Sequence, residues 1–287
     1  MSVPILGRRR RDIKGLAFQG LLLMSLVVGF ATLVVLLVDV LRKGLPHVNK
    51  QLFTDPPSID PSIAGARPAI LATIFLGIGL LIFAVPIGVG TAVYLEEYAD
   101  RNRWYNRLLE LNIQNLAAVP SIVYGILGLA FLVRGIGLDR VLLAGALILT
   151  LLVLPTVIIA SREAIRAVPD SIRQGAYALG ATRWQVTYRQ VLPGALPGIA
   201  TGSILALSRG LGETAPLIMI GAVTYIAFDP TILGPFTALP IQIYQWVRLP
   251  QEEFRSLAAA AIIVLLGIIL SLNAVAIWLR NKYQRRW

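Results

Sequence analysis

Six long stretches of this chain carry almost no charge, and the polar residues gather in the segments between them. Five of the stretches are at least 21 residues long, enough for a helix rising 1.5 Å per residue to cross about 30 Å of hydrocarbon. The pattern predicts an all-α polytopic membrane protein with six transmembrane helices. The predicted spans are Gly15–Val38, Pro68–Leu95, Leu111–Val133, Val141–Ser161, Gln190–Ser208 with a continuation past Glu213 to Phe228, and Ser256–Leu279.

The composition agrees with a membrane protein and argues against an enzyme. Hydrophobic residues make up 56% of the chain and charged residues 14%, whereas a soluble domain carries about 25% charged residues. The chain has no cysteine and a single histidine, His47, so it lacks disulfides, thiolate metal sites and a His-rich zinc site. We therefore expect no catalytic residue and no metal site.

The distribution of lysine and arginine predicts the orientation of the spans. With the N-terminus inside, 17 basic residues face the cytoplasm, 8 face the exterior, and Arg209 lies within a span. The positive-inside rule then places both termini in the cytoplasm. The run Arg8–Arg11 could bind nucleic acid, but directly before an apolar span it is typical of a topology signal, so we expect membrane lipid and no nucleic acid as its partner. The first apolar run exceeds a signal-peptide core of about 7–15 residues and is expected to remain as an anchor.

Charge and turn residues divide the chain into two parts. Residues 1–67 are expected to form a cytoplasmic basic arm, the first transmembrane helix and an exterior loop, and residues 68–287 a membrane-spanning core with a cytoplasmic loop at about 162–193. Near the end of the core, Pro235–Arg255 contains Tyr244, Trp246 and Arg248. This segment is expected to lie at the exterior interface, as a gate or dock or as a surface anchor.

The loop at 162–193 has the pattern of two short helices joined by a tight turn. The first begins at Asp170 and stops at Gly180, and Thr182 with Gln185 forms a capping box for the second, which Pro193 is expected to end. The unit is either an amphipathic hairpin on the inner leaflet or a docking surface for another protein. Its apolar stripes are Ile172, Ala176 and Leu179 in the first helix and Trp184, Tyr188 and Val191 in the second.

The fifth span contains an arginine about 20 Å along its length, well inside the bilayer. Arg209 needs a partner there, and Glu213 lies one helical turn further on. The two residues form either a purely structural ion pair or a site where Arg209 binds a passing anion and Glu213 orients it. Since Gly210, Gly212 and Pro216 surround the pair, we expect the helix to break or tilt at this point.

A row of small residues precedes this site at intervals of four positions. Such a row lets a second helix approach closely, either within the bundle, which we favour, or at a dimer seam. The row consists of Gly194, Gly198, Gly202, Ala206 and Gly210.

The loop at 162–193 resembles the cytoplasmic loop of ABC importer permeases, which reads Glu-Ala-Ala, three residues, Gly, nine residues, Ile, one residue, Leu-Pro. Gln174-Gly175-Ala176, Gly180 and Leu192-Pro193 stand at the corresponding positions, with departures at Gln174, Gly175 and Gln190. Further segments are similar to the PstA-type subunit of phosphate importers, over roughly residues 68–277. They are Asn112–Leu116, Val119–Gly125, Ala178–Trp184 and Leu211–Pro216.

The resemblance implies the type I ABC importer permease fold, a place in the cytoplasmic (inner) membrane, and a set of partner subunits. These are a PstC-type permease in a heterodimer, two PstB-type ATPase subunits and an exported PstS-type phosphate-binding protein. Because the chain has no Gly-x-x-x-x-Gly-Lys-[Ser/Thr] motif, ATP and Mg are expected only in the partner ATPases.

The residues so identified have two expected roles. Arg209, Glu213 and Thr214 are expected to line the substrate path. Coupling to the ATPase is expected of Gln174, Gly175, Ala176, Leu179, Gly180, Ala181 and Thr182. A permease for sulfate or molybdate is the alternative within this class, and a stand-alone channel or secondary carrier is the alternative outside it.

Overall fold

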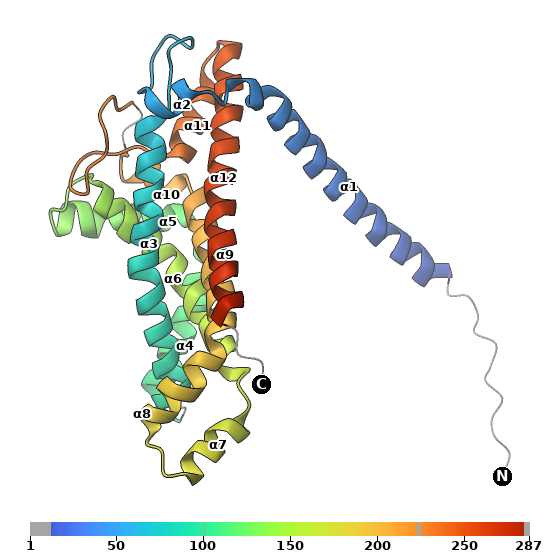
Figure 1. Cartoon of the computed structure of the whole chain (residues 1–287), viewed down its shortest axis with the longest axis vertical. Helices are drawn as coiled ribbons and strands as arrows, with labels where there is room; N and C mark the ends of the chain where they lie inside the picture. The colour runs from blue at the N-terminus through green and yellow to red at the C-terminus, as the bar shows by residue number, and fades with distance from the viewer. Residues whose placement is uncertain (1–12, 101, 223–224, 284–287) are drawn as a thin grey trace.

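The computed structural model describes residues 13–100, 102–222 and 225–283 as an elongated bundle of helices from which one helix diverges (Figure 1). These residues form no β-strand, only an isolated bridge between Val141 and Pro235. The long helices are α1 (Ile13–Gly44), α3 (Arg67–Val93), α6 (Leu142–Arg166), α9 (Leu192–Gly212) and α12 (Glu252–Tyr283). The shorter ones are η1 (Leu45–His47), α2 (Lys50–Thr54), η2 (Tyr94–Tyr98), α4 (Trp104–Ala117), α5 (Ser121–Gly128), η3 (Leu129–Gly135), α7 (Asp170–Ala178), α8 (Arg183–Val186), η4 (Thr187–Val191), α10 (Ala215–Met219) and α11 (Leu239–Arg248).

Helices α3, α6 and α9 form the centre of the bundle, and α6 is its most buried long helix. Helix α9 lies close to α6 because small residues face each other across the contact. A Cβ added at Gly198 would lie 2.7 Å from the Cβ of Ala164, and one added at Gly202 would collide with Ala160. The prediction that the small-residue row serves packing within the bundle is therefore confirmed.

Helix α1 extends away from the bundle and touches it at one end only (Figure 1). Its apolar window is fully exposed, and its contact with α12 forms where Gly44 lies against the backbone of Ala259. Among the described residues, helix α1 is one of five helices long and apolar enough to cross a membrane. The predicted topology signal, Arg8–Arg11, lies outside the described residues.

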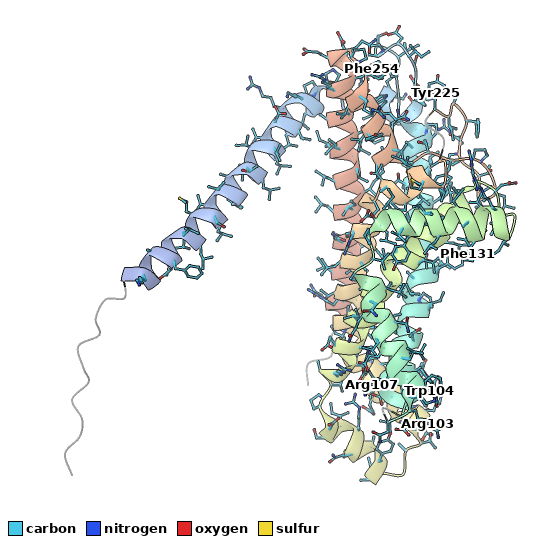
Figure 2. All side chains as sticks on the ribbon, turned by 180° about the vertical axis from the view of Figure 1, so that it is seen from behind. Arg103, Trp104, Arg107, Phe131, Tyr225 and Phe254 are labelled. Carbon is cyan, nitrogen blue, oxygen red and sulfur yellow. The ribbon has the colours of Figure 1, made fainter. Side chains whose placement is uncertain are left out.

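The third predicted span, Leu111–Val133, is sharply bent at Pro120. Helix α4 and the α5–η3 segment meet at an angle of 107° around Pro120, so the third apolar region is a bent pair. The cause is local, since Pro120 has no N–H to donate to the carbonyl of Leu116. The hydroxyl of Tyr124 donates to that carbonyl instead, at 2.8 Å. Figure 2 shows Phe131 on the arm that the second half of the pair extends sideways.

Pro193 does not end the second loop helix, contrary to the prediction. Helix α8 continues through η4 into α9, so that a single helical rod runs from Arg183 to Gly212. Pro193 lies in the first turn of α9, directly after the π-turn η4. In a π-turn the backbone hydrogen bonds already depart from the regular α-helical pattern, so the N–H that a proline lacks is tolerated there. The predicted loop and the predicted fifth span are therefore one continuous element.

The segment after α10 closes the end of the bundle opposite to α7 and α8. Its carbonyls at Gly234 and Ile232 accept the N–H groups of Leu142 and Leu143 at 3.0 Å, which caps the start of α6. The interfacial role expected of Trp246 is wrong, because this side chain is buried at 2% exposure against Phe254. Tyr244 and Arg248 of the same segment remain exposed.

Candidate functional site

The fifth apolar region breaks between α9 and α10, where the sequence predicted a break. Helix α9 ends at Gly212, Glu213 adopts an extended backbone conformation, and α10 begins two residues later with Pro216 in its first turn. A continued α-helix would force the ring of Pro216 against the carbonyl of Gly212. The break lies next to the two charged side chains, and a helix end leaves main-chain polar groups without intrahelical partners.

Arg209 lies on the surface of this chain and not in its core. Its side chain is 64% exposed, and Glu213, 21% exposed, approaches its Nε with Oε1 at 3.8 Å. A separation of 3.8 Å is too long for a hydrogen bond, so the pair leaves the guanidinium donors available for other acceptors. Leu205 and Gly212 share the exposed face of α9 with Arg209, while Gly210 and Leu211 face the bundle.

The bend in the third apolar region and the break in the fifth one meet in space. Helix α5 packs against α10, and a Cβ added at Gly125 would lie 2.7 Å from the Cα of Pro216. Two segments about 90 residues apart in the sequence thus support each other behind the Arg209 site. Sequence reasoning noted both segments only as family motifs and missed this contact. The available signal was the presence of two glycines, Gly125 and Gly128, in the short helix α5.

The α7–α8 hairpin has the local geometry that its sequence predicts. Gly180 has φ +80°, in the left-handed region that favours glycine, and it ends α7. Thr182 and Gln185 form the predicted capping box, in which the Gln185 side chain accepts from the Thr182 N–H at 2.8 Å. Leu179 is 90% exposed at the tip of the hairpin. A leucine so exposed is typical of a surface that another protein covers.

All seven residues expected to couple to an ATPase lie on this hairpin. A cleft of about 470 Å³ between α7 and the α8–η4 segment contains five of them. Gln174 and Thr182 are exposed outside this lining. Those in the cleft are Gly175, Ala176, Leu179, Gly180 and Ala181.

Trp184 and Tyr188 stack with each other on the exposed face of the α8–η4 segment, with ring centroids 5.7 Å apart. Of the second predicted apolar stripe, only Val191 is buried. The stripe is therefore divided: its last residue packs into the bundle, and its two aromatic residues extend the exposed surface of the hairpin.

The fold, the loop and the broken helix together define a multi-pass permease. The chain belongs to the family of binding-protein-dependent transport system inner membrane components, whose family model matches residues 84–286. Members of this family are permease subunits of ABC transporters and are not themselves catalytic. The protein is therefore a multi-pass component of the inner membrane. Within the described residues, no group of three His, Cys, Asp or Glu side chains is placed to hold a metal ion.

Its relatives include phosphate permeases from distant organisms. It is 32% identical to the phosphate transport system permease protein PstA 1 of Mycobacterium tuberculosis H37Rv, over 96% of this chain and 91% of the relative. It is 31% identical to PstA of Yersinia pestis, over 88% and 85%, and 30% identical to a probable PstA of Methanocaldococcus jannaschii, over 94% and 94%. The resemblance to PstA-type subunits read from the sequence motifs is confirmed.

Solved importers share the fold. A bacterial ABC transporter that imports alginate matches with a TM-score of 0.59 at 21% identity, covering 93% of this chain and 98% of the other. The MetNI methionine ABC transporter in an inward-facing conformation matches with a TM-score of 0.60 at 18% identity, covering 76% and 94%. The expected type I importer permease fold is therefore confirmed.

Proposed function

We propose that this chain is the permease subunit through which an ATP-driven importer carries inorganic phosphate across the inner membrane by alternating access. The observation that carries the proposal is its identity of about 30%, over nearly its whole length, to relatives named phosphate transport permeases. The proposed partners are a PstC-type permease, two PstB-type ATPases that bind ATP and Mg, and a PstS-type binding protein. Both termini face the cytoplasm in this proposal, as the charge distribution predicts.

Arg209 is the proposed phosphate contact of this chain. Its guanidinium is exposed and only loosely paired, and it has the planar donor fork that suits phosphate oxygens. Because Arg209 lies on an outer face of α9, a closed path needs a second permease to supply the opposite wall. Glu213 limits how tightly the anion is held, and Thr214 adds a hydroxyl at the helix break. A site on a transport path must release its ion as well as bind it.

The α7–α8 hairpin is the proposed docking surface for an ATPase subunit. Its cleft and its exposed Leu179 supply the contact area. Since α8 is continuous with α9, a displacement of the hairpin acts directly on the helix that carries Arg209. Closure of the two ATPases would thus open the path alternately to the two faces of the membrane.

The test is uptake of radiolabelled phosphate into proteoliposomes that contain the complete complex. We expect ATP-dependent uptake that excess sulfate and molybdate do not compete away. Arg209→Ala should lower uptake about tenfold or more while the complex still assembles, because a charge-assisted hydrogen bond contributes about 1.5–3 kcal/mol. Arg107→Ala, which removes another exposed arginine at the α7–α8 end (Figure 2), serves as the matched control.

The outcomes separate the alternatives. Uptake of sulfate or molybdate in place of phosphate would assign a different oxyanion, and transport by this chain alone would indicate a channel or secondary carrier. Phosphate uptake that survives Arg209→Ala would leave the importer in place and make the Arg209–Glu213 pair purely structural.

A further inference from the structure

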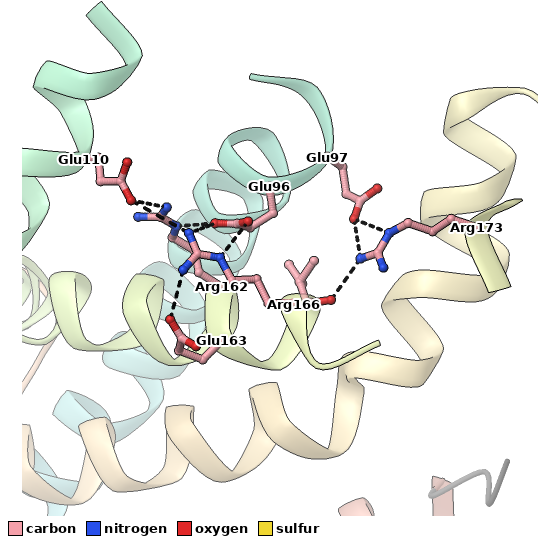
Figure 3. Close-up of polar contacts among 8 residues, drawn as sticks. Glu96, Glu97, Glu110, Arg162, Glu163, Arg166 and Arg173 are labelled. Carbon is pink, nitrogen blue, oxygen red and sulfur yellow. Dashed lines mark hydrogen bonds and ion pairs between the residues drawn. The ribbon is translucent and has the colours of Figure 1, made fainter. Parts of the chain in front are cut away.

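Two consecutive carboxylates lie at the end of α3, in the π-turn η2. Glu96 and Glu97 have side chains only 3% and 6% exposed. Burying a carboxylate without a partner costs several kcal/mol, so each of them needs a cation. Figure 3 shows that the two side chains turn to different arginines on different helices. The π-turn therefore works as a junction between two ion-pair systems.

Glu96 joins the helices of the bundle to one another. It accepts from Nε of Arg162 at 2.6 Å and from Nε of Arg166 at 2.9 Å, both on α6. Arg162 also donates to Glu110 of α4 at 2.5 Å. The ends of α3, α4 and α6 are thus tied together through a single carboxylate and its partners (Figure 3).

Glu97 joins the bundle to the hairpin. Its Oε1 accepts from Arg173 of α7 through Nη2 at 2.8 Å and Nε at 3.2 Å. The same guanidinium donates to the carbonyls of Ile165 and Val168 at 3.0 and 2.7 Å, at the end of α6. A single side chain of α7 therefore contacts α3 and also satisfies carbonyls left over where α6 ends.

The second half of the hairpin reaches the same turn. The guanidinium of Arg183, at the start of α8, lies 5.1 Å from the centroid of the Tyr98 ring in η2. A polar cleft of about 600 Å³ beside these contacts is lined by Glu97, Arg166, Arg173 and Arg183, among others. The turn η2 is thus contacted by both helices of the hairpin, beside a polar cleft.

Helix α7 has few other ways to transmit a displacement. None of its residues is fully buried, and Ile172 and Ala176 are only partly covered. Sparse apolar packing lets one helix slide along another. An ion pair in which two N–H groups of a planar guanidinium donate to one carboxylate fixes both the distance and the direction between the two helices. The contact between Arg173 and Glu97 is therefore the stiffest side-chain link from α7 to α3.

We infer that the Arg173–Glu97 pair is the joint that passes movement of the α7–α8 hairpin to α3, and that the Glu96–Arg162–Glu110 contacts spread it to α6 and α4. Arg173 and Glu97 are positioning residues in this scheme, since they act through the helices they join. The inference rests on the proposed function, because the hairpin must be driven by an ATPase for its movement to matter.

The test measures phosphate transported per ATP hydrolysed by the complete complex in proteoliposomes. Glu97→Gln and Arg173→Lys should each lower this ratio by at least about fivefold while ATP hydrolysis continues, because coupling between two sites is typically 5–150-fold. Arg173→Lys keeps the charge and removes the planar fork. Glu163→Gln is the control, since Glu163 pairs with Arg166 at 3.3 Å but its side chain is 66% exposed. It should leave the ratio within about twofold of the unmodified complex.

If the phosphate transported per ATP hydrolysed stays unchanged in assembled Arg173→Lys and Glu97→Gln complexes, the inference is overturned. It is also overturned if both variants lose phosphate transport and ATP hydrolysis in equal proportion. If Glu97→Gln fails to assemble, Arg173→Lys decides. Absence of phosphate uptake by the unmodified complex would instead overturn the proposed function.

Discussion

Single residues determine how closely the central helices approach. Glycine at 198 and 202 lets the backbone of α9 approach α6, since the alanines opposite leave no room for a side chain. In a membrane, where apolar side chains gain little by leaving lipid, this close packing is a main source of helix association. The same residue type at Gly90 of α3 has no atom within 4 Å of an added Cβ and so carries no such constraint.

We expect Gly202→Val to destabilise the purified protein by about 1–3 kcal/mol, because the added atoms collide with Ala160 and force α9 away from α6. Thermal unfolding in detergent, followed by loss of the monodisperse peak in size-exclusion chromatography, measures the effect. Gly90→Val is the matched control and should shift the midpoint much less. Equal shifts for the two variants would contradict the packing role assigned to Gly202.

At the scale of the element, turns and breaks matter more than helix propensity. Pro120 bends the third apolar region, and Pro216 with Gly212 interrupts the fifth, yet Pro86 and Pro155 lie inside α3 and α6, which both continue past them. Pro155 is buried within the bundle and Pro86 is exposed on α3, yet neither helix breaks. At Pro120 the chain bends, and the hydroxyl of Tyr124 donates to the carbonyl of Leu116 that the proline leaves without its helical donor.

The turn at Gly180 offers a test at this scale. Gly180→Val should separate ATP hydrolysis from transport, because a β-branched residue is strained at φ +80° and would change the angle between α7 and α8. Gly180→Asn should retain most of the transport, since asparagine tolerates the left-handed region. Both are measured as phosphate uptake and ATPase activity of the assembled complex. Unaffected transport in Gly180→Val would remove the turn from the coupling route.

The whole molecule has two distinct ends. One holds the α7–α8 hairpin and the ion pairs around η2, and the other holds α2, α11 and the segment that caps α6 (Figure 1). Helix α1 joins the bundle only at the second end. The division of the chain near residue 67 stays a prediction, and the divergence of α1 supports it. The predicted orientation places the hairpin end in the cytoplasm.

The absence of cysteine from the sequence makes this orientation directly measurable. Single-cysteine variants Ile59→Cys and Asn102→Cys place an exposed thiol at opposite ends of the molecule. A membrane-impermeant maleimide applied to cells with a permeabilised outer membrane should label position 59 at once, and position 102 only after the inner membrane is opened. The reverse pattern would invert the topology and would make an ATPase contact at the hairpin impossible.

The sequence by itself determined the class, the apolar spans, the hairpin with its glycine turn and capping box, and the break near Glu213. All of these follow from local rules: apolar length, charge placement, and the backbone chemistry of glycine and proline. It also paired Arg209 with Glu213, because residues four positions apart share a helix face.

Only the tertiary structure decided which surfaces meet. It showed that the small-residue row faces α6, that Trp246 is buried, that α8 and α9 form one rod, and that Gly125 lies behind the helix break at Pro216. It also brought Arg173 to Glu97, 76 positions away in the chain. Such contacts depend on how helices dock across long sequence separations, and a local pattern of apolar and polar residues does not encode that docking.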